Sequence, residues 1–387
     1  MPATGDMVQV HTLVAYPASL LNRDDAGLAK RIPFGGVERT RISSQCLKKH
    51  WRDSQRVAEL GELAVRSTRI YEDLVARTLV KDHGASEAEA AAVARFLMEE
   101  TVNTKPAKSR DGKETLQSGQ LLVLTRAETR FLAERGAEIL AKLKEAGSAV
   151  GTHDDVRKAG VFDKKQWGPT LKTLQASIDT AMFGRMVTSD LFARVDAAVS
   201  VAHAFTTHAA AAESDYFTAV DTLKDEDEGE DAGAGLIGET ELTSGVFYTY
   251  AVIDMNQLRA NLGEQETDAE TLARALVEAI ATVSPGAKRG STAPYSFAEL
   301  VLLERGAGQP RTLANAFLKP VEAGGAGVMA ASVAALADHR TKLEDRMYGP
   351  FQGLSVVSGI HDETDAVRAD RLPFQAVLDR VFPGARP

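Results

Sequence analysis

The chain has 387 residues, 44% of them hydrophobic and 26% charged, which allows one large or several ordinary domains and excludes a largely disordered protein. A single cysteine, Cys46, excludes a disulfide framework and a multi-cysteine zinc site. No apolar run is long enough to cross a membrane and residues 1–10 lack a signal pattern, so we expect a cytoplasmic protein with no membrane partner. The net charge of −9 argues against general nucleic-acid binding, but the positive charges are unevenly distributed.

The first part of the chain contains strand and helix signals separated by a loop. Residues 8–14 alternate in a way that predicts a strand, and the loop that follows ends in Gly35-Gly36. Ser43 or Ser44 is suited to cap a helix that begins near residue 45.

Residues 63–197 have mainly helical patterns. Two capping-box candidates, Ser86 with Glu89 and Thr125 with Glu128, precede segments with helical apolar spacing. Residues 103–118 have the composition of an exposed loop. The block resembles a helical insertion into a domain that contains β-strands.

Strand patterns return after residue 198. Two alternating segments, 215–223 and 236–244, flank the acidic, glycine-rich stretch 224–235 and predict a long β-hairpin with an acidic tip. Further strands are predicted at 198–208, 246–255, 299–303 and 354–359, with a helix over 271–283. This order of elements predicts an α+β domain with two inserted segments, the helical block and the hairpin. An RRM-like sheet is compatible with this order.

The segment from residue 23 to 52 is strongly basic within an acidic protein. Its eight positive and three negative side chains leave a net charge of +5. Its positive residues are Arg23, Lys30, Arg31, Arg39, Arg41, Lys48, Lys49 and Arg52. At about 100° per residue, Gln45, Lys48, Lys49 and Arg52 share one helix face, while Leu47 and Trp51 lie opposite. The face is either a solvated helix surface or a grip for phosphate groups.

Three weaker features allow a functional and a structural interpretation. Lys288 and Arg289 form a glycine-flanked pair that suits either a phosphate contact or a surface turn. Asp24 and Asp25 resemble half of a metal-dependent nuclease site, but a turn or ion-pair role is favoured because no partner carboxylate motif accompanies them. Apolar residues on the predicted hairpin either pack against their own domain or wedge between bases; they are Tyr216, Phe217, Val220 and Ile237.

Other chemistry-bearing motifs are missing from the sequence. His203 and His208 lack the spacing of metal ligands, and there is no P-loop, nucleophile elbow or zinc-protease motif. The sequence therefore predicts no cofactor, no metal and no catalytic residue.

A series of motifs in the same order resembles the CasC backbone subunit of the type I-E CRISPR Cascade. The motifs span roughly residues 8 to 317 and are LNRDD (21–25), FGG (34–36), RISSQCLKKHWR (41–52), GRMVTSD (184–190), SVAHAFTTH (200–208), DYFTAVD (215–221), SGVFYTYA (244–251), PGAKR (285–289) and LANAF (313–317). The sequence departs from the family pattern at Cys46, where a small polar residue is more familiar, and in the longer acidic tip.

The resemblance implies a hand-like subunit of a ribonucleoprotein. It implies an RRM-like (ferredoxin-like) palm over 1–62, 198–207 and 246–387, helical fingers over 63–197 and a β-hairpin thumb over 208–245. Family members polymerise head-to-tail along the CRISPR guide RNA, beside other Cascade subunits, and present the guide for pairing with target DNA. They are not enzymes; a separate helicase-nuclease is recruited to cut the target.

The resemblance also assigns roles to individual residues. Phosphate contacts fall on Arg23, Lys30, Arg41, Ser43, Gln45, Lys48, Lys49 and Arg52, to which we add Lys288 and Arg289 from the basic loop. Met186 matches a position near the guide bases, and the thumb wedge matches Phe217, Thr218, Val220 and Ile237. The alternatives are a metal-dependent RNA endonuclease that uses Asp24 or Asp25 and a stand-alone RNA-binding protein.

Overall fold

The computed structural model describes residues 5–102, 106–108, 111, 114–147, 150–160, 162–174, 176–187, 189–220, 234–263 and 267–386, with the backbone alone at 114, 164, 218–220 and 234–237. The chain forms two compact units. Unit 1 comprises Met1–Val57, Val199–Asn256 and Ala269–Pro387, and unit 2 comprises Ala58–Ala198 and Gln257–Asp268. No helix in these ranges is long and apolar enough to span a membrane.

Unit 1 is built on one large sheet with the strand order β14-β13-β12-β1-β11-β9-β3-β2, and β8 and β10 also pair with β11. Its pairs are antiparallel except for β13 with β14. The strands are β1 (Met7–Ser19), β2 (Arg31–Phe34), β3 (Val37–Ile42), β8 (Val199–Val201), β9 (Ala204–Thr206), β10 (Ala212–Val220), β11 (Ala234–Asp254), β12 (Ala298–Gly306), β13 (Gly353–Gly359) and β14 (Asp370–Arg371).

The middle of this sheet has the strand order of an RRM. β12, β1, β11 and the β8–β9 segment lie side by side, which places the fourth, first, third and second strands of the motif next to one another. Helices α1 and α10 lie between the successive strand pairs in sequence, as the two crossovers of the motif require. The predicted RRM-like (ferredoxin-like) α+β fold is therefore confirmed.

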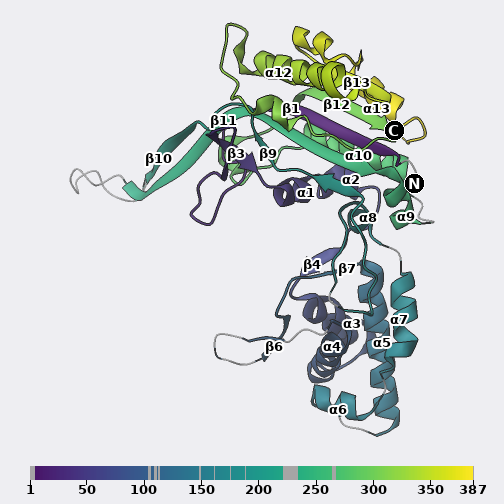
Figure 1. Cartoon of the computed structure of the whole chain (residues 1–387). Helices are drawn as coiled ribbons and strands as arrows, with labels where there is room; N and C mark the ends of the chain where they lie inside the picture. Colours follow the sequence, from purple (N-terminus) through teal and green to yellow (C-terminus); the bar gives the residue numbers. More distant parts are fainter. Residues whose placement is uncertain are drawn as a thin grey trace. The chain divides into compact units, whose positions relative to one another are not determined.

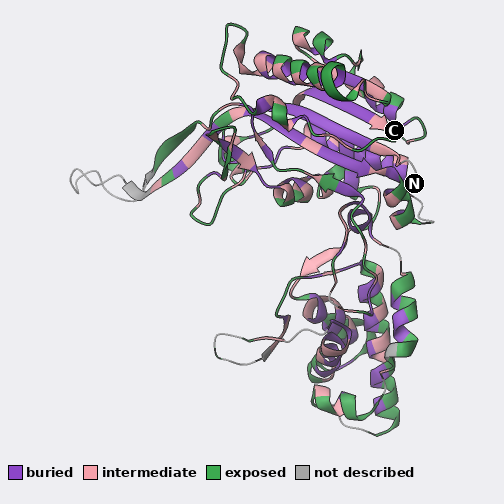
Figure 2. Cartoon of the chain, in the orientation of Figure 1, coloured by how far each residue is buried: buried purple, intermediate pink, exposed green. Residues whose placement is uncertain are grey.

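Helices cover both faces of the sheet. Figure 1 shows α12 over one face and α1 and α10 over the other. The helical elements that begin in unit 1 are α1 (Ser44–Arg52), α2 (Gln55–Ala58), α9 (Met255–Leu262), α10 (Ala269–Thr282), α11 (Arg289–Thr292), η2 (Ala314–Phe317), α12 (Gly327–Leu343), η3 (Glu344–Tyr348), η4 (Asp362–Val367) and α13 (Phe374–Val381). Because helices pack on both sides, β1 is buried along most of its length, as Figure 2 shows for the central strands.

The predicted hairpin is formed by β10 and β11, which pair from Ala212↔Thr243 to Val220↔Ala234. The prediction of separate strands at 236–244 and 246–255 is wrong, because β11 runs through both without a break. Its second half pairs with β1, so the hairpin is a direct extension of the central sheet (Figure 1). Most of the predicted acidic tip, 224–235, lies outside the described residues.

A second hairpin, β2–β3, occupies part of the segment expected to be a loop. Phe34 pairs with Val37 across a two-residue turn, in which Gly35 and Gly36 have φ angles of 65° and 82°. Positive φ at both positions is typical of a type I′ turn, which glycine tolerates best. A Cβ atom on Gly35 would also lie 1.8 Å from the carbonyl oxygen of Leu318, so the close approach of this chain requires glycine.

Unit 2 is mainly helical around its own apolar core. Its elements are β4 (Val65–Ser67), η1 (Tyr71–Ala76), α3 (Arg77–His83), α4 (Glu87–Val102), β5 (Pro106–Lys108), β6 (Glu114–Ser118), β7 (Leu122–Leu124), α5 (Arg126–Glu145), α6 (His153–Lys158), α7 (Lys164–Thr173) and α8 (Ile178–Phe183). The two predicted capping boxes, at Ser86 and Thr125, are confirmed by reciprocal hydrogen bonds. The prediction of a loop over 103–118 is wrong in part, because β5 and β6 pair there.

Candidate nucleic-acid interface

Helix α1 begins at Ser44 with Ser43 as its cap, whose hydroxyl accepts a hydrogen bond from the N–H of Cys46 at 3.3 Å. Leu47 and Trp51 are buried, which confirms the predicted inner face.

The predicted outer face of α1 is only partly free. Gln45 and Lys49 are exposed, whereas Lys48 and Arg52 are half-buried. Burial lowers the pKa of the Lys48 ammonium group. The carboxylate of Asp53 pairs with Lys49 at 3.1 Å and with Arg52 at 3.2 Å, so the helix supplies less uncompensated charge than its sequence indicates.

The loop before β2 connects the start of α1 to the hairpin. The side-chain oxygen of Asn22 accepts a hydrogen bond from the N–H of Ser43 at 2.8 Å, and its carbonyl accepts one from Lys30 at 2.9 Å. At the other end, Glu241 on β11 accepts a hydrogen bond from the N–H of Ala29 at 2.6 Å and forms an ion pair with Arg31. The loop therefore holds Lys30 between α1 and β11.

Four cations, Lys30, Arg41, Lys49 and Arg289, gather around this part of unit 1, and we call them the basic cluster. Burial raises the pKa of the Cys46 thiol, and the charges of Lys49, Lys30 and Arg289 oppose that shift, so all three lie near Cys46. Lys30 and the fourth cation, Arg41, together lie near the His203 side chain. The structure thus brings together charges that are up to 259 positions apart in the sequence, from residue 30 to residue 289.

The loop that carries Lys288 and Arg289 joins the basic cluster to the hairpin. The N–H of Ala287 donates to the carbonyl of Leu20 at 2.9 Å. The ammonium group of Lys288 donates to the hydroxyl of Thr240 and lies 5.5 Å from the centre of the Phe217 ring. Arg289 donates to the carbonyl of Ser284 at 2.8 Å.

The predicted wedge residues all lie on the hairpin strands. Thr218 is opposite Ile237 and Val220 is opposite Ala234, but the side chains of Thr218, Val220 and Ile237 are outside the described part of the structure. The ring of Phe217 lies over Gly238 on the facing strand and remains 41% exposed. Phe217 therefore both packs on its own hairpin and offers an apolar surface.

Asp24 has a structural role in the loop that it shares with Arg23. Its carboxylate accepts hydrogen bonds from the N–H groups of Ala26 at 2.9 Å and Leu28 at 3.0 Å, the pattern of an Asx turn. Arg23 and Asp25 are both exposed. No three His, Cys, Asp or Glu side chains in the described ranges are grouped so that they could hold a metal ion.

Two further residues of the sequence analysis lie elsewhere. Arg39, counted in the basic segment, is fully buried and donates to the carbonyls of Phe34, Thr206 and Phe317 at 2.7–3.1 Å. Met186 belongs to unit 2, where it is 86% exposed.

Sequence reasoning assigned no role at this surface to four side chains: Asn22, His203, Thr240 and Glu241. Asn22 and His203 lie inside the motifs LNRDD and SVAHAFTTH, so the family resemblance already pointed to their segments. No sequence motif points to Thr240 or Glu241, because only the register of the hairpin brings them to the loops beside it.

Two solved chains resemble this protein over nearly its whole length. A solved chain from a "CRISPR RNA-guided surveillance complex, pre-nicking" is 28% identical, with a TM-score of 0.81 over 98% of this chain and 100% of that chain. A chain from a "CRISPR RNA-guided surveillance complex" is 24% identical and has the same fold, with a TM-score of 0.72 over 98% of this chain and 100% of that one. No curated protein matches by sequence. The model of the CT1975-like proteins matches residues 8–382, which confirms the resemblance to CasC-type backbone subunits, and the chain belongs to this family.

Proposed function

We propose that this protein is a non-catalytic guide-RNA-binding backbone subunit of a cytoplasmic type I-E Cascade complex. The observation that carries the proposal is the connected surface from the start of α1, through Lys30, to Lys288 and Phe217 on the hairpin. It joins a basic cluster suited to phosphate groups with an apolar side chain suited to bases. The similarity to a chain of an RNA-guided surveillance complex supports the same function.

The chemistry of this surface suits RNA of any sequence. Cations and backbone N–H groups at a helix start contact phosphates, which carry no sequence information. In RNA-guided systems the sequence is read by base pairing instead. The residues to which we assign phosphate contacts are Arg23, Lys30, Arg41, Ser43, Gln45, Lys48, Lys49, Arg52, Lys288 and Arg289.

The remaining roles follow from the family. Unit 1 without its hairpin acts as the palm, the helical unit 2 acts as the fingers with Met186 near the guide bases, and the hairpin acts as the thumb. Phe217, Thr218, Val220 and Ile237 displace a base of the guide at each subunit. Copies associate head-to-tail through a heterologous contact, which generates an open helix along the RNA. Other Cascade subunits complete the complex, and a recruited helicase-nuclease cuts the paired target DNA.

The function is tested by expressing the chain with a CRISPR guide RNA and measuring the mass of the purified complex and the length of its RNA. A filament protects a long RNA and has a mass that rises in steps of one subunit as the guide is lengthened. A Lys30→Ala, Lys49→Ala double variant loses RNA at moderate salt, because each charge-assisted contact contributes about 1.5–3 kcal/mol and every subunit repeats the loss.

Lys342→Ala is the matched control. Lys342 on α12 is also exposed and pairs with a carboxylate four residues away, Asp338, as Lys49 does with Asp53. The control retains its RNA. If the wild-type chain bound one short RNA per monomer whatever the guide length, it would be a stand-alone RNA-binding protein instead.

The non-catalytic assignment is supported by the engagement of the Asp24 carboxylate in the turn. The assembled complex is incubated with matched labelled RNA and DNA and Mg²⁺ or Mn²⁺, without added nuclease. Cleavage that disappears in Asp24→Ala or Asp25→Ala would establish the endonuclease alternative.

A further inference from the structure

Two potentially cationic side chains touch each other at the surface of unit 1. Arg41 lies on β3, His203 lies between β8 and β9, and β3 pairs with β9. The guanidinium Nη1 atom of Arg41 is 3.1 Å from Nδ1 of His203. Since an arginine only donates, Nδ1 accepts this bond and the imidazole proton is on Nε2. His203 is exposed, so its Nε2–H group is accessible from solvent.

The neighbours of this pair are positive as well. The Nε atom of Arg41 donates to the carbonyl of Arg31 at 3.2 Å, which fixes the guanidinium beside the imidazole. The charged groups that face His203 are Arg41 and Lys30. Partial burial, followed by these two charges, lowers the pKa of His203 and so favours the neutral imidazole.

Such a group of donors suits one particular kind of ligand. Arg41, Lys30 and the Nε2–H of His203 present hydrogen-bond donors and positive charge from three chain segments. In the described part of the chain no carboxylate pairs with Arg41 or Lys30. A phosphate group satisfies donors of this type, and charge-assisted bonds to it are stronger than a neutral Arg–His contact.

We propose that His203, Arg41 and Lys30 form a binding site for one phosphate group of single-stranded RNA, and that His203 takes up a proton when the phosphate binds. The phosphate replaces the Arg41–His203 hydrogen bond with one bond to each side chain, and the proton comes from solvent. The site rests on the proposed RNA-binding function and adds to it a residue, His203, and a pH dependence.

The sign of the pH dependence follows from linkage. Binding that raises the proton affinity of His203 is strongest at low pH and weakens as the pH rises through the pKa of the bound imidazole. A shift of one pKa unit on binding corresponds to a tenfold change in affinity. We therefore expect the affinity for RNA to be higher at pH 6 than at pH 8, by up to about tenfold for each pKa unit that His203 gains on binding.

The experiment measures the affinity of the full chain for a labelled single-stranded RNA at pH 6 and pH 8, at constant ionic strength, by fluorescence anisotropy. His203→Gln keeps a neutral donor and is expected to bind as the wild type does at pH 8 but without the gain at pH 6. His203→Lys, with a permanent charge, is expected to bind equally well at both pH values.

His339→Gln is the control, because His339 is a half-buried histidine of α12 whose pKa is also lowered, mainly by burial. It keeps the wild-type pH dependence, and circular dichroism verifies that all variants are folded. If His203→Gln keeps the wild-type pH dependence while the wild type binds RNA, the phosphate site is wrong and the proposed function stands. If the folded wild type binds no RNA at either pH, both are wrong.

Discussion

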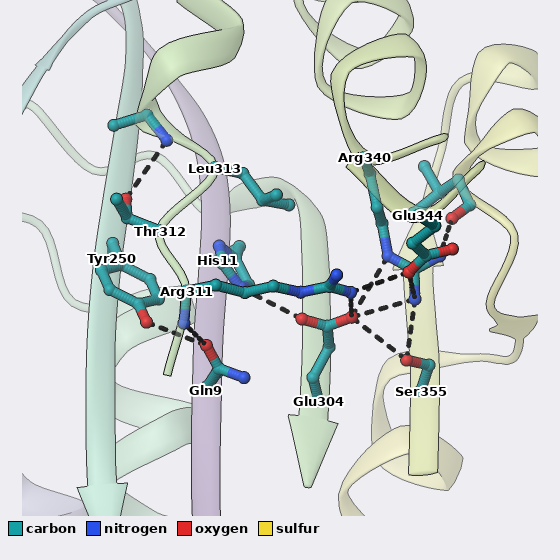
Figure 3. Close-up of polar contacts among 12 residues, drawn as sticks. Gln9, His11, Tyr250, Glu304, Arg311, Thr312, Leu313, Arg340, Glu344 and Ser355 are labelled. Carbon is teal, nitrogen blue, oxygen red and sulfur yellow. Dashed lines mark hydrogen bonds and ion pairs between the residues drawn. The ribbon is translucent and has the colours of Figure 1, made fainter. Parts of the chain in front are cut away.

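Unit 1 contains two groups of charged side chains that the sequence does not distinguish and the structure treats in opposite ways. One is a buried network on the α12 face of the sheet, formed by His11, Glu304, Arg311, Arg340 and Glu344 (Figure 3). The other is the basic cluster of Lys30, Arg41, Lys49 and Arg289. In the first group the charged side chains pair with one another, whereas within the described residues most cations of the second group have no carboxylate partner.

In the buried network, each charge has a partner. One carboxylate oxygen of Glu304 accepts from Arg340 at 2.9 Å and from Arg311 at 3.3 Å, and Arg311 also pairs with Glu344 at 2.7 Å. Burial by itself would raise the pKa of Glu304, but His11 and the two arginines lower it to about 2. The charges of this network are therefore compensated mainly by one another.

In the basic cluster, protein partners are mostly neutral. Arg41 contacts a histidine and a carbonyl, Arg289 contacts a carbonyl, and in the described ranges no carboxylate pairs with Lys30. Uncompensated cations repel one another, so a bound anion lowers the electrostatic energy of the basic cluster more than that of the buried network. Compensation by carboxylates, more than the number of arginines and lysines, therefore distinguishes a structural charge from a candidate for anion binding.

The largest expected effect comes from breaking the buried network. Glu304→Ala leaves Arg340 and Arg311 without their shared carboxylate, and we expect the free energy of unfolding to fall by about 3–5 kcal/mol. Chemical denaturation measures it. The control, Glu299→Ala, removes a partly exposed pair with His361 and costs about 1 kcal/mol or less. Equal losses in the two variants would contradict the difference between buried and exposed charges.

The same carboxylate gives a pH signature. Because its folded pKa is about 2 and its ordinary value is 4.5, Glu304 stabilises the fold fully above pH 4.5, and this contribution is lost as the pH falls towards 2. The gap in stability between the wild type and Glu304→Gln is therefore expected to narrow over that interval. A gap that stays constant from pH 6 to pH 2.5 would show that the charge of Glu304 is not what stabilises the network.

The next largest effect on stability is expected at Arg39. This residue is part of the basic segment in the sequence, but in the structure it is buried like the charged residues of the network. Arg39→Lys retains the charge but cannot reach three carbonyl groups, so we expect a loss of about 3 kcal/mol in unfolding free energy. The salt dependence of RNA binding by the folded variant is expected to stay unchanged. A changed salt dependence would place Arg39 among the RNA contacts.

A smaller effect is expected from the exposed group. Lys49→Ala lowers the slope of log affinity for single-stranded RNA against log salt by about 0.7, because one phosphate contact is lost. Its unfolding free energy changes by no more than about 1 kcal/mol, since its pair with Asp53 is at the surface. Lys342→Ala is expected to leave the slope unchanged. An equal change in both variants would mean that the slope depends on the net charge of the protein and not on a phosphate contact of Lys49.

A similarly small effect on stability is expected at the β10–β11 hairpin, the proposed thumb. A Cβ on Gly238 would lie 2.4 Å from the end of the Phe217 ring, which can rotate away at a cost of about 0.5–1.5 kcal/mol. Gly238→Ala therefore leaves the salt slope unchanged but disturbs the wedge. The measurement is the affinity for target DNA with single mismatches placed at each position along the guide. In the wild type we expect mismatches at regularly spaced positions to cost no affinity, and in the variant we expect this regular pattern to be weaker. A loss of affinity that is the same at every position in the wild type would contradict the proposal that the hairpin displaces guide bases.

Local signals in the sequence were sufficient for much of the fold. The cap at Ser43, the two capping boxes and the strand over residues 8–14 depend on neighbours within four residues, and each is present in the structure. The sequence does not predict the β2–β3 hairpin, in spite of the Gly35-Gly36 pair at its turn. A short exposed strand has little hydrophobic pattern of its own.

Whether a charged side chain is buried and paired or exposed and unpaired depends on the tertiary structure. Arg39 and Arg41 are two positions apart on β3 and therefore on the same face, so composition and periodicity treat them alike. Arg39 is buried because the carbonyls of Thr206 and Phe317, from distant parts of the chain, close around it. Arg41, two positions further along the strand, contacts the exposed His203 instead. The amino-acid sequence is sufficient to show that this segment is basic. Which of its charges stay exposed and uncompensated depends on the packing of remote segments, because burial and compensation are set by contacts across the chain.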